Sequence, residues 1–562
     1  MSRLADHPAA LIRFYHDKAT ASATRQQQQH VPAAPTPPLD TCLYRRPVTD
    51  QAAADAIPVL VDDTYHLFHL ITPVATKHHP DRLRSSWSRI RSTNLIEWTR
   101  DARPVITPGD APTDPDADGA WTGAALLGPD GNMNIFYTGY NLLRGGRQVI
   151  LRTRASDRYG TLFEKPATPI TILGDGLARY EDIDFRDPYV FYNAAESRYW
   201  MLVATRLASG PHWSRGCVAL LTSPDLDVWT AAPEPLYAPS DVFCPECPEL
   251  FTLPNGRWYL VYSRFHAPGA GTVYRVADNP RGPFRVPRDG SHGRLDGRRW
   301  YAAKSCPKAG DARKRISFGW LGDYDDDESK WLWGGDLTIP REMYADSNGH
   351  LRIKADRGLR NFLWQTSKTV CPSNAASSLY LCSLGSTATH YPELGAVALR
   401  RDLFIDFKVA ACDAHTFGVM FQTDESGKGH RLQFSPSGNG LFSVAIWTDF
   451  PPLDDFWANQ YSLHLPRPID GPELVRHDNV SLVEGVFLFL RGQIVEAFCG
   501  GRSLSFRLPL PLPLSCQEAP CGEIRRFGWF VEDGMVDIVD ISVRHRIKEG
   551  AFDEEDAIGD HE

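Results

Sequence analysis

A single glutamate, Glu246, stands between two cysteine–proline pairs in the segment FCPECPELF. Proline fixes φ and has no backbone N–H, so Pro245 and Pro248 hold the main chain on both sides of this carboxyl group. Loss of water around a carboxyl raises its pKa, because burial disfavours the charged form. A carboxylic acid that stays protonated near neutral pH can donate a proton to a reacting group. Glu246 is therefore a candidate general acid, and an exposed glutamate in a capped turn is the alternative.

Two aspartates upstream stand in comparable contexts. Asp55 occurs in DAIPVLVDDTYHLF, directly ahead of the first expected innermost strand. Asp187 occurs in FRDPYVF, after Arg186. If the three segments belong to repeated units arranged around one axis, side chains that are distant in the sequence can converge there. Three such carboxyl groups could supply both a proton donor and a charged partner.

The elements that would position these side chains are short strands. From about residue 50 to 344, aromatic and β-branched runs alternate with Gly, Pro, Asn and Asp, the pattern of strands and turns. The runs recur roughly every 55–70 residues, the length of one propeller blade. A turn followed by Leu and Trp also occurs twice, in STNLIEW from Ser92 and SPDLDVW from Ser223. The similar runs are TYHLFHL from Thr64, MNIFYTGY from Met133, PYVFY with RYWMLVATR from Pro188, RWYLVYSRF from Arg257 and RISFGWLGDY from Arg315.

The predicted fold is all-β, with a five-bladed β-propeller at residues 46–355 followed by a C-terminal β-sandwich at residues 370–548. The second region holds many short alternating strands, such as RDLFIDFKVA and HRLQFS, without a blade repeat. Residues 1–45 contain QQQQH and PAAPTPP and are expected to be a flexible N-terminal arm. Residues 549–562 are expected to be a solvated acidic tail.

Composition excludes several kinds of partner. The formal net charge is -9 and no basic block is present, which argues against nucleic acid or an anionic membrane. No apolar run is long enough for a signal peptide or a membrane span, so we expect a cytoplasmic protein. Cys244 and Cys247 form one CxxC without a second ligand pair, and no phosphate-binding loop is evident. We therefore expect no cofactor and no metal, a solvated loop at Asp323–Glu328, and a small-molecule substrate.

Segments from about residue 50 to 548 resemble, in order, the glycoside hydrolase clan of families 32, 43 and 68. The closest resemblance is to family 32, the invertase and fructan hydrolase family. FRDPYVF is similar to its Arg-Asp-Pro motif and PECPELF to its Glu-Cys-Pro motif. Further similar segments are SSWSRIRSTNLIEW (Ser85–Trp98), GAWTGAALL (Gly119–Leu127), RRWYAAKS (Arg298–Ser305), GDLTIPREM (Gly335–Met343) and GQIVEAFCGGRSLSFRL (Gly492–Leu508).

The resemblance implies a retaining glycosidase that hydrolyses or transfers a furanosyl unit, most plausibly a β-fructofuranosyl unit. It implies that Asp55 is the nucleophile, that Glu246 is the general acid/base and that Asp187 stabilises the charged sugar ring. A retaining enzyme needs two carboxyl groups about 5–5.5 Å apart, one of which attacks while the other donates a proton. Their environments must differ so that one stays ionised and the other protonated.

The same resemblance implies substrate-binding residues. Arg186 would hold a sugar hydroxyl or keep the neighbouring aspartate ionised. Trp87 and Trp121 would form apolar walls for the sugar ring. For each tryptophan alone, a place in the propeller core fits the sequence equally well.

The first motif departs from the family pattern. The family has Trp-Met-Asn-Asp-Pro-Asn-Gly, whereas this chain has AAADAIPVLVDD, in which Asp62 and Asp63 are expected to be turn residues. The family's Phe-Tyr-Gln is Phe68-His69-Leu70 here. Missing amide side chains weaken recognition of a hydroxylated ligand by about 1–3 kcal/mol for each unmatched buried group.

Two other functions therefore stay open. One is a glycosidase-like scaffold recruited to a fungal-type biosynthetic pathway, for dehydration, cyclisation or a hetero-Diels–Alder-like cycloaddition of a small non-sugar metabolite. The other is a non-catalytic carbohydrate-binding protein, which has little need for three converging carboxylates.

Overall fold

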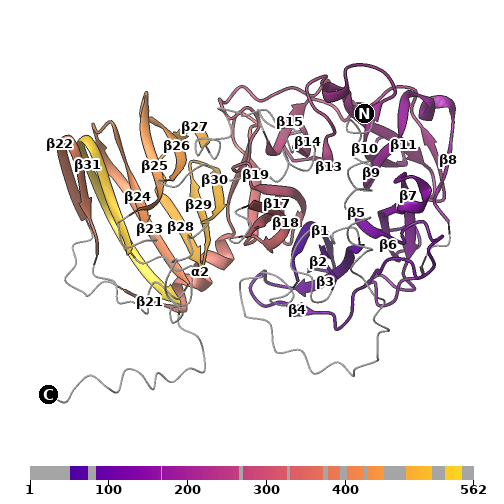
Figure 1. Ribbon diagram of the computed structural model, residues 1–562, viewed down its shortest axis with the longest axis horizontal. Helices are drawn as coiled ribbons and strands as arrows, with labels where there is room; N and C mark the ends of the chain where they lie inside the picture. Colours follow the sequence, from indigo (N-terminus) through magenta and orange to yellow (C-terminus); the bar gives the residue numbers. More distant parts are fainter. Residues whose placement is uncertain are drawn as a thin grey trace, which may run out of the picture.

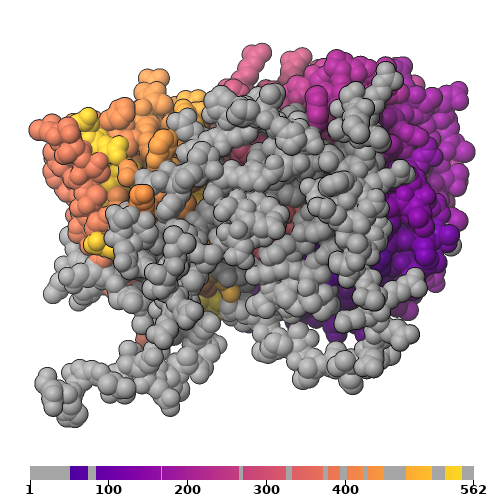
Figure 2. All heavy atoms as spheres, in the orientation of Figure 1, coloured from indigo at the N-terminus to yellow at the C-terminus, as the bar shows by residue number. Residues whose placement is uncertain are grey.

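The computed structural model describes residues 51–73, 84–165, 168–264, 270–325, 330–370, 378–392, 402–422, 428–448, 476–508 and 526–546. These residues form a five-bladed β-propeller and a C-terminal β-sandwich, which confirms the predicted fold. The two parts occupy opposite ends of the molecule (Figures 1 and 2). The N-terminal arm and the acidic tail predicted from the sequence lie outside the described residues.

Blades 1 to 3 are antiparallel sheets in chain order, except that one short strand, β8, pairs in parallel with β12. Blade 1 holds β1 (Ala53–Val61), β2 (Thr64–Ile71), β3 (Ser86–Ser92) and β4 (Thr99–Arg100). Blade 2 holds β5 (Gly119–Leu127), β6 (Met133–Tyr140) and β7 (Gln148–Arg154). Blade 3 holds β8 (Thr171–Leu173), β9 (Tyr180–Asn193), β10 (Arg198–Leu207), β11 (Gly216–Ser223) and β12 (Val228–Ala231).

Blades 4 and 5 complete the ring. Blade 4 holds β13 (Glu246–Thr252), β14 (Trp258–Arg264) and β15 (Gly271–Ala277). Blade 5 holds β16 (Trp300–Lys308), β17 (Asp311–Asp325) and β18 (Lys330–Leu337), and β19 (Arg341–Ala345) and β20 (Leu351–Ala355) extend it. Ala53 of β1 pairs with Gly335 of β18, so the first and last blades are joined by backbone pairing.

The repeated runs found in the sequence form the strand next to the innermost one in each blade, namely β2, β6, β10, β14 and β17, except that PYVFY belongs to the innermost strand β9. The β6 strand is buried along its whole length. A strand that is covered on both faces reads as a continuous apolar and aromatic run rather than an alternating one. This is why these five segments resemble one another in the sequence.

The second sequence repeat is a shared turn at the edge of blades 1 and 3. The hydroxyl of Ser92 accepts a hydrogen bond from the N–H of Leu95 at 2.8 Å, and that of Ser223 accepts one from Leu226 at 3.0 Å. Both leucines have positive φ, 63° and 76°. The indole of the tryptophan three residues after each leucine donates to that leucine's carbonyl, at 3.3 and 3.1 Å. The two turns therefore have the same hydrogen bonds, as expected for repeated units.

A short helix, α2 (Arg357–Gln365), connects the propeller to the sandwich, and the carboxylate of Asp356 caps it by accepting from the N–H of Leu359 at 2.9 Å. The sandwich strands belong to one hydrogen-bonded set in which the long β31 pairs with four others. Apolar side chains such as Phe417, Leu488 and Trp529 fill its core. Its strands are β21 (Ser367–Thr369), β22 (Ser378–His390), β23 (Leu403–Cys412), β24 (Thr416–Gln422), β25 (Gly429–Gly438), β26 (Leu441–Thr448), β27 (Arg476–Ser481), β28 (Val486–Arg491), β29 (Ile494–Cys499), β30 (Arg502–Arg507) and β31 (Arg526–Arg546).

A buried ion cluster joins the two domains. The guanidinium of Arg341, on β19, has no exposed surface and contacts Asp296 at 2.5 Å and Glu496 of the sandwich at 2.6 Å. It also donates to the hydroxyls of Ser503 at 3.0 Å and Ser505 at 2.6 Å. The propeller and the sandwich therefore share one set of charges from which water is excluded.

A second ion pair across the same interface corrects one prediction. Asp323 was expected to begin a solvated loop, but it lies within β17, is only 6% exposed and pairs with Arg507 of β30 at 3.3 Å. A run of acidic letters does not show which of its members faces a cation on a distant strand.

Candidate active site

Each innermost strand of the propeller contains a β-bulge. The ladder loses register between Ala54 and Ala56 in β1, so the intervening residue is the extra one. Comparable shifts occur in β5, β9, β13 and β16 against their neighbours. A bulge re-aims a side chain out of the regular alternation, and bulges concentrate next to active sites. The two aspartates and the glutamate singled out in the sequence lie at three of these bulges.

Asp55 is the extra residue of the first bulge. It lies inside β1 as the third residue of that strand, not ahead of it as expected from the sequence. Its φ of 33° is a conformation that aspartate tolerates better than most residues. Its Oδ1 accepts a hydrogen bond from the indole N–H of Trp320 in blade 5 at 2.9 Å. Asp62 and Asp63 form the turn between β1 and β2, as predicted.

Asp187 and Glu246 lie on adjacent blades. Asp187 has a φ of 58°, and its N–H donates to the hydroxyl of Thr138 in blade 2 at 2.8 Å. Its Oδ2 accepts from the N–H of Cys247 at 2.9 Å, so the residue next to Glu246 fixes this carboxylate. Glu246 is the first residue of β13 and is followed by the left-handed Cys247, with φ of 51°. The strand that carries Glu246 thus orients Asp187, and Arg186, on the strand that carries Asp187, contacts Glu246 in turn.

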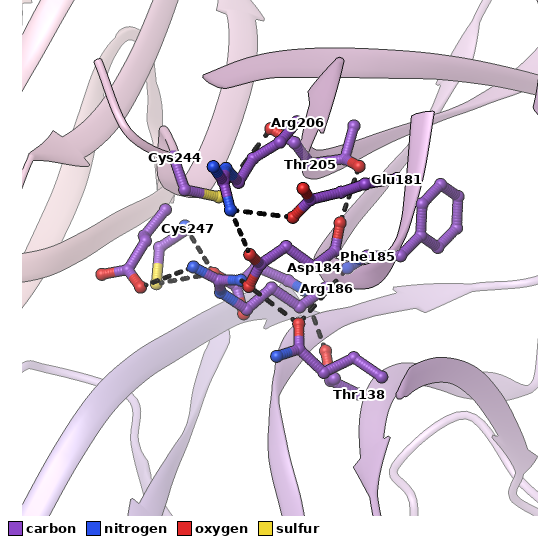
Figure 3. A network of polar contacts seen from close by, with 12 residues as sticks. Thr138, Glu181, Asp184, Phe185, Arg186, Thr205, Arg206, Cys244 and Cys247 are labelled. Atoms are coloured by element: carbon purple, nitrogen blue, oxygen red, sulfur yellow. Dashed lines mark hydrogen bonds and ion pairs between the residues drawn. The ribbon is translucent and has the colours of Figure 1, made fainter. Parts of the chain in front are cut away.

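Arg186 connects these strands to a buried charge network. Its guanidinium donates to Oε1 of Glu246 at 2.9 Å and to Oε1 of Gln148 at 3.2 Å, and it pairs with Asp184. Asp184 also contacts Arg206, at 3.3 Å, so this carboxylate lies between two arginines, Arg186 and Arg206 (Figure 3). Arg186 is held from both sides, so its position against Glu246 is fixed.

The electrostatics of the trio favour a bound proton. Burial raises the pKa of Asp55 to about 7, the charges of Asp187 and Glu246 add to this rise, and Lys304 and the Trp320 hydrogen bond oppose it. Burial also raises the pKa of Glu246, and Arg186 counteracts part of that rise. Carboxyl groups that interact this strongly titrate as a set. Near neutral pH the site can therefore hold a carboxylic acid beside a carboxylate.

Blade 5 supplies two contacts that sequence reasoning did not identify. The hydroxyl of Tyr301 donates to Oε2 of Glu246 at 2.5 Å, and the indole of Trp320 donates to Asp55. Their rings lie 5.9 Å apart, so the pair connects the two carboxyl groups. Tyr301 belongs to RRWYAAKS, a segment already noted for its family resemblance, but nothing in the segment singled out its hydroxyl.

The same segment places a buried cation near the trio. Lys304 is 2% exposed, and its ammonium group donates to the carbonyl of Gly123 at 2.6 Å. Its charge lowers the pKa of Asp55 and so favours the ionised form of that carboxyl. A lysine in a strand is not distinguishable in sequence from a solvated one.

The two tryptophans expected to contact a sugar differ in position. Trp87 has no exposed surface, and its indole donates to the carbonyl of Trp121 at 3.0 Å, so Trp87 is a core residue rather than a wall of an open site. Trp121 is partly exposed, and its ring stacks on Tyr140 with centroids 4.3 Å apart. The departures from the family pattern also lie at the site, where buried Ala54 and Ala56 flank Asp55.

Across the described ranges, no three His, Cys, Asp or Glu side chains are arranged to hold a metal ion. Within the same part of the chain, no helix has the length and apolar character needed to span a membrane.

A family model described as "Glycosyl hydrolases family 32 N-terminal domain" matches residues 56–355. The match begins directly after Asp55, next to the segment in which the sequence departs from the family pattern. Among curated proteins, the insoluble β-fructofuranosidase isoenzyme CWINV1 of Arabidopsis thaliana is 28% identical over 344 residues, which is 54% of this chain and 56% of that protein. The match thus spans about half of the relative's length.

Solved structures extend the likeness over both domains. A fructan 1-exohydrolase IIa of Cichorium intybus in complex with 1-kestose has a TM-score of 0.62 and 17% identity, covering 91% of this chain and 97% of that one. An exo-inulinase of Aspergillus awamori has a TM-score of 0.64 and 16% identity, covering 91% and 99%. At these identities the likeness shows the fold alone.

Proposed function

Because the chain belongs to glycosyl hydrolase family 32, we propose that it is a retaining glycosidase that acts on β-fructofuranosides. The observation that supports this most is the convergence of three carboxyl groups from blades 1, 3 and 4. Asp55, Asp187 and Glu246 are far apart in the sequence, yet their charges interact at one site. The proposal takes the substrate class from the relatives, whose names include a fructofuranosidase and an exo-inulinase.

The mechanism assigns a role to each group. A carboxylate oxygen of Asp55 attacks the anomeric carbon, the bond from that carbon to the leaving oxygen breaks, and Glu246 gives its proton to that oxygen. Glu246 then removes a proton from water, and the water oxygen displaces Asp55 from the sugar. Asp187 faces the ring and stabilises its positive charge in both steps. Tyr301 and Arg186 stabilise the ionised form of Glu246 between the two steps.

The central test is turnover by wild type and Glu246→Gln with sucrose, short fructans and nitrophenyl furanosides. We expect wild type to release fructose and Glu246→Gln to lose about a thousandfold or more of its activity on sucrose, because the amide cannot supply the proton. The substitution keeps the size of the side chain, so both proteins should melt at similar temperatures. Sugar release by the variant at the wild-type rate would contradict the proposed role of Glu246.

The pH dependence is a second prediction. Asp55 must be ionised to attack, so kcat/KM should rise as the pH increases through about 7, the raised pKa of that carboxyl. Glu246 must be protonated, so activity should fall as this carboxyl, whose pKa is raised by burial, loses its proton. We expect a bell-shaped profile when kcat/KM is measured from pH 4 to 10. An acidic limb near pH 4, the range of a solvated aspartate, would contradict the assignment of Asp55.

One observation favours a second candidate. Ala54 and Ile57 stand where the family motif carries its two asparagines, so the strand around Asp55 lacks both amide side chains. A site with fewer hydrogen-bonding groups suits a less hydroxylated ligand, such as the small non-sugar metabolite of a recruited biosynthetic scaffold. A folded wild-type protein that releases no sugar from any of the three substrate classes would overturn the glycosidase proposal and favour this one.

A further inference from the structure

The loop between β10 and β11 lies at the catalytic end of blade 3. Leu207, the last residue of β10, pairs with Tyr180, the first residue of β9. Asp55 and Glu246 also lie in the first halves of their strands, as the third residue of β1 and the first of β13, and Asp187 lies at the middle of β9. Residues 208–215 are therefore at the same end of the propeller as the site, and they carry Trp213.

Trp213 packs on the segment that leads into Glu246. Its ring lies 5.1 Å from the ring of Phe243, tilted by 42°. The residue that follows the loop contacts the same segment, since the N–H of Gly216 donates to the carbonyl of Val242 at 2.9 Å. A Cβ at Gly216 would lie 2.5 Å from the carbonyl oxygen of Phe243, so only glycine permits this approach. The loop and the segment directly before β13 therefore pack as one unit.

The charge network behind Glu246 fixes the same unit. Arg206 stacks on the ring of Phe243 with its guanidinium carbon 4.0 Å from the ring centre. It donates to the carbonyl of His212, next to Trp213, at 2.9 Å. Its other nitrogen contacts Asp184, which pairs with the Arg186 that contacts the proton donor. Arg206 and Asp184 thus connect the residue next to Trp213 to the arginine that contacts Glu246.

Despite this packing, Trp213 is 42% exposed. An aromatic face that is immobilised yet open to solvent can bind a flat or apolar surface with little loss of side-chain freedom. We propose that Trp213 determines specificity for the leaving group, by stacking on the sugar ring whose oxygen receives the proton of Glu246. This inference deepens the proposed function and rests on it, because the leaving group must lie on the side of the proton donor.

The test compares two substrates that share the fructosyl unit. Sucrose has a sugar as its leaving group, whereas methyl β-D-fructofuranoside has only a methyl group. We expect Trp213→Ala to lower kcat/KM for sucrose about tenfold, the loss of one aromatic stacking contact, and to leave the methyl glycoside within about twofold. Trp213→Phe should keep most of the activity on sucrose. Tyr192→Ala serves as the matched control, because Tyr192 is 52% exposed near the opposite end of β9.

The outcomes separate the inference from the function on which it rests. Equal losses on both substrates, or no loss on sucrose, would overturn the role of Trp213 while leaving the glycosidase proposal intact. The same holds if Tyr192→Ala shows the same selective loss. Absence of turnover of both substrates by wild type would overturn the proposed function, and this inference would fall with it.

Discussion

Asp55→Asn should reduce turnover of sucrose roughly ten-thousand-fold and should also raise the melting temperature at pH 8. The loss of activity follows from removal of the attacking oxygen, since an amide is a poor nucleophile. The gain in stability follows from the burial that raises the pKa of this carboxyl to about 7. The folded protein at pH 8 holds a buried negative charge that the variant lacks.

The sign of the stability effect depends on pH. An unfolded aspartate has a pKa of about 3.9, so the folded protein binds this proton more tightly than the unfolded chain does. The stabilising contribution of the protonated form is complete below pH 4 and is lost as the pH rises through about 7. Asp55→Asn should therefore stabilise the protein by on the order of 4 kcal/mol at pH 8, and by about a third of that at pH 5, where part of the contribution is already lost.

Thermal unfolding at both pH values, together with turnover, checks this prediction. Asp63→Asn is the matched control, because Asp63 is exposed in the turn after the same strand and has a similar positive φ of 60°. We expect the control to keep full activity and an unchanged melting temperature. A destabilised Asp55→Asn protein at pH 8 would contradict the raised pKa, because the amide oxygen of asparagine can still accept the hydrogen bond from Trp320.

Arg341→Met should uncouple the sandwich from the propeller. The substitution removes the cation and leaves Asp296 and Glu496 buried without their partner. Breaking a buried ion pair by removal of one member costs roughly 3–5 kcal/mol. We expect calorimetry to show one unfolding transition for wild type and two for the variant, because each domain has its own apolar core.

A more exposed ion pair provides the comparison. Arg360 of α2 pairs with Asp406 of the sandwich at 2.6 Å, but the two side chains are 45% and 24% exposed. Exposed pairs contribute about 0–1 kcal/mol, so Arg360→Met should leave the single transition unchanged. If both variants lose the same stability, the buried cluster is not what couples the domains.

The sequence supported the blade repeat, because strands buried on both faces carry a recognisable apolar run. It also indicated Asp187 and Glu246, since RDP and ECP are short and specific motifs, whereas Asp55 stands in a segment that departs from the family motif. It could not supply the bulge at Asp55, because an extra residue in a ladder has no signature in the alternation of side chains. The aspartate was therefore expected ahead of the strand rather than inside it.

Contacts between the last blade and the first blade could not be predicted from the sequence either. Trp320 and Asp55 are separated by 265 residues, and they meet because the last blade packs on the first. The same limit applies to Trp87, whose aromatic ring suits either a sugar or a core. In the structure, the rings of Phe68 and Tyr137 pack around Trp87, which places Trp87 in the core.

The bulges have a consequence for how such a propeller can change its chemistry. In four of the five innermost strands, a residue at the bulge has positive φ, namely Asp55, Asp187, Cys247 and Ala302. Asparagine, aspartate and glycine tolerate this conformation, and the ladder resumes its register directly afterwards. A functional group can therefore be exchanged at one of these positions while the surrounding sheet stays in place. Ala302 bears only a methyl group and is buried in the apolar core, so an acid or amide introduced there would need a buried hydrogen-bond partner.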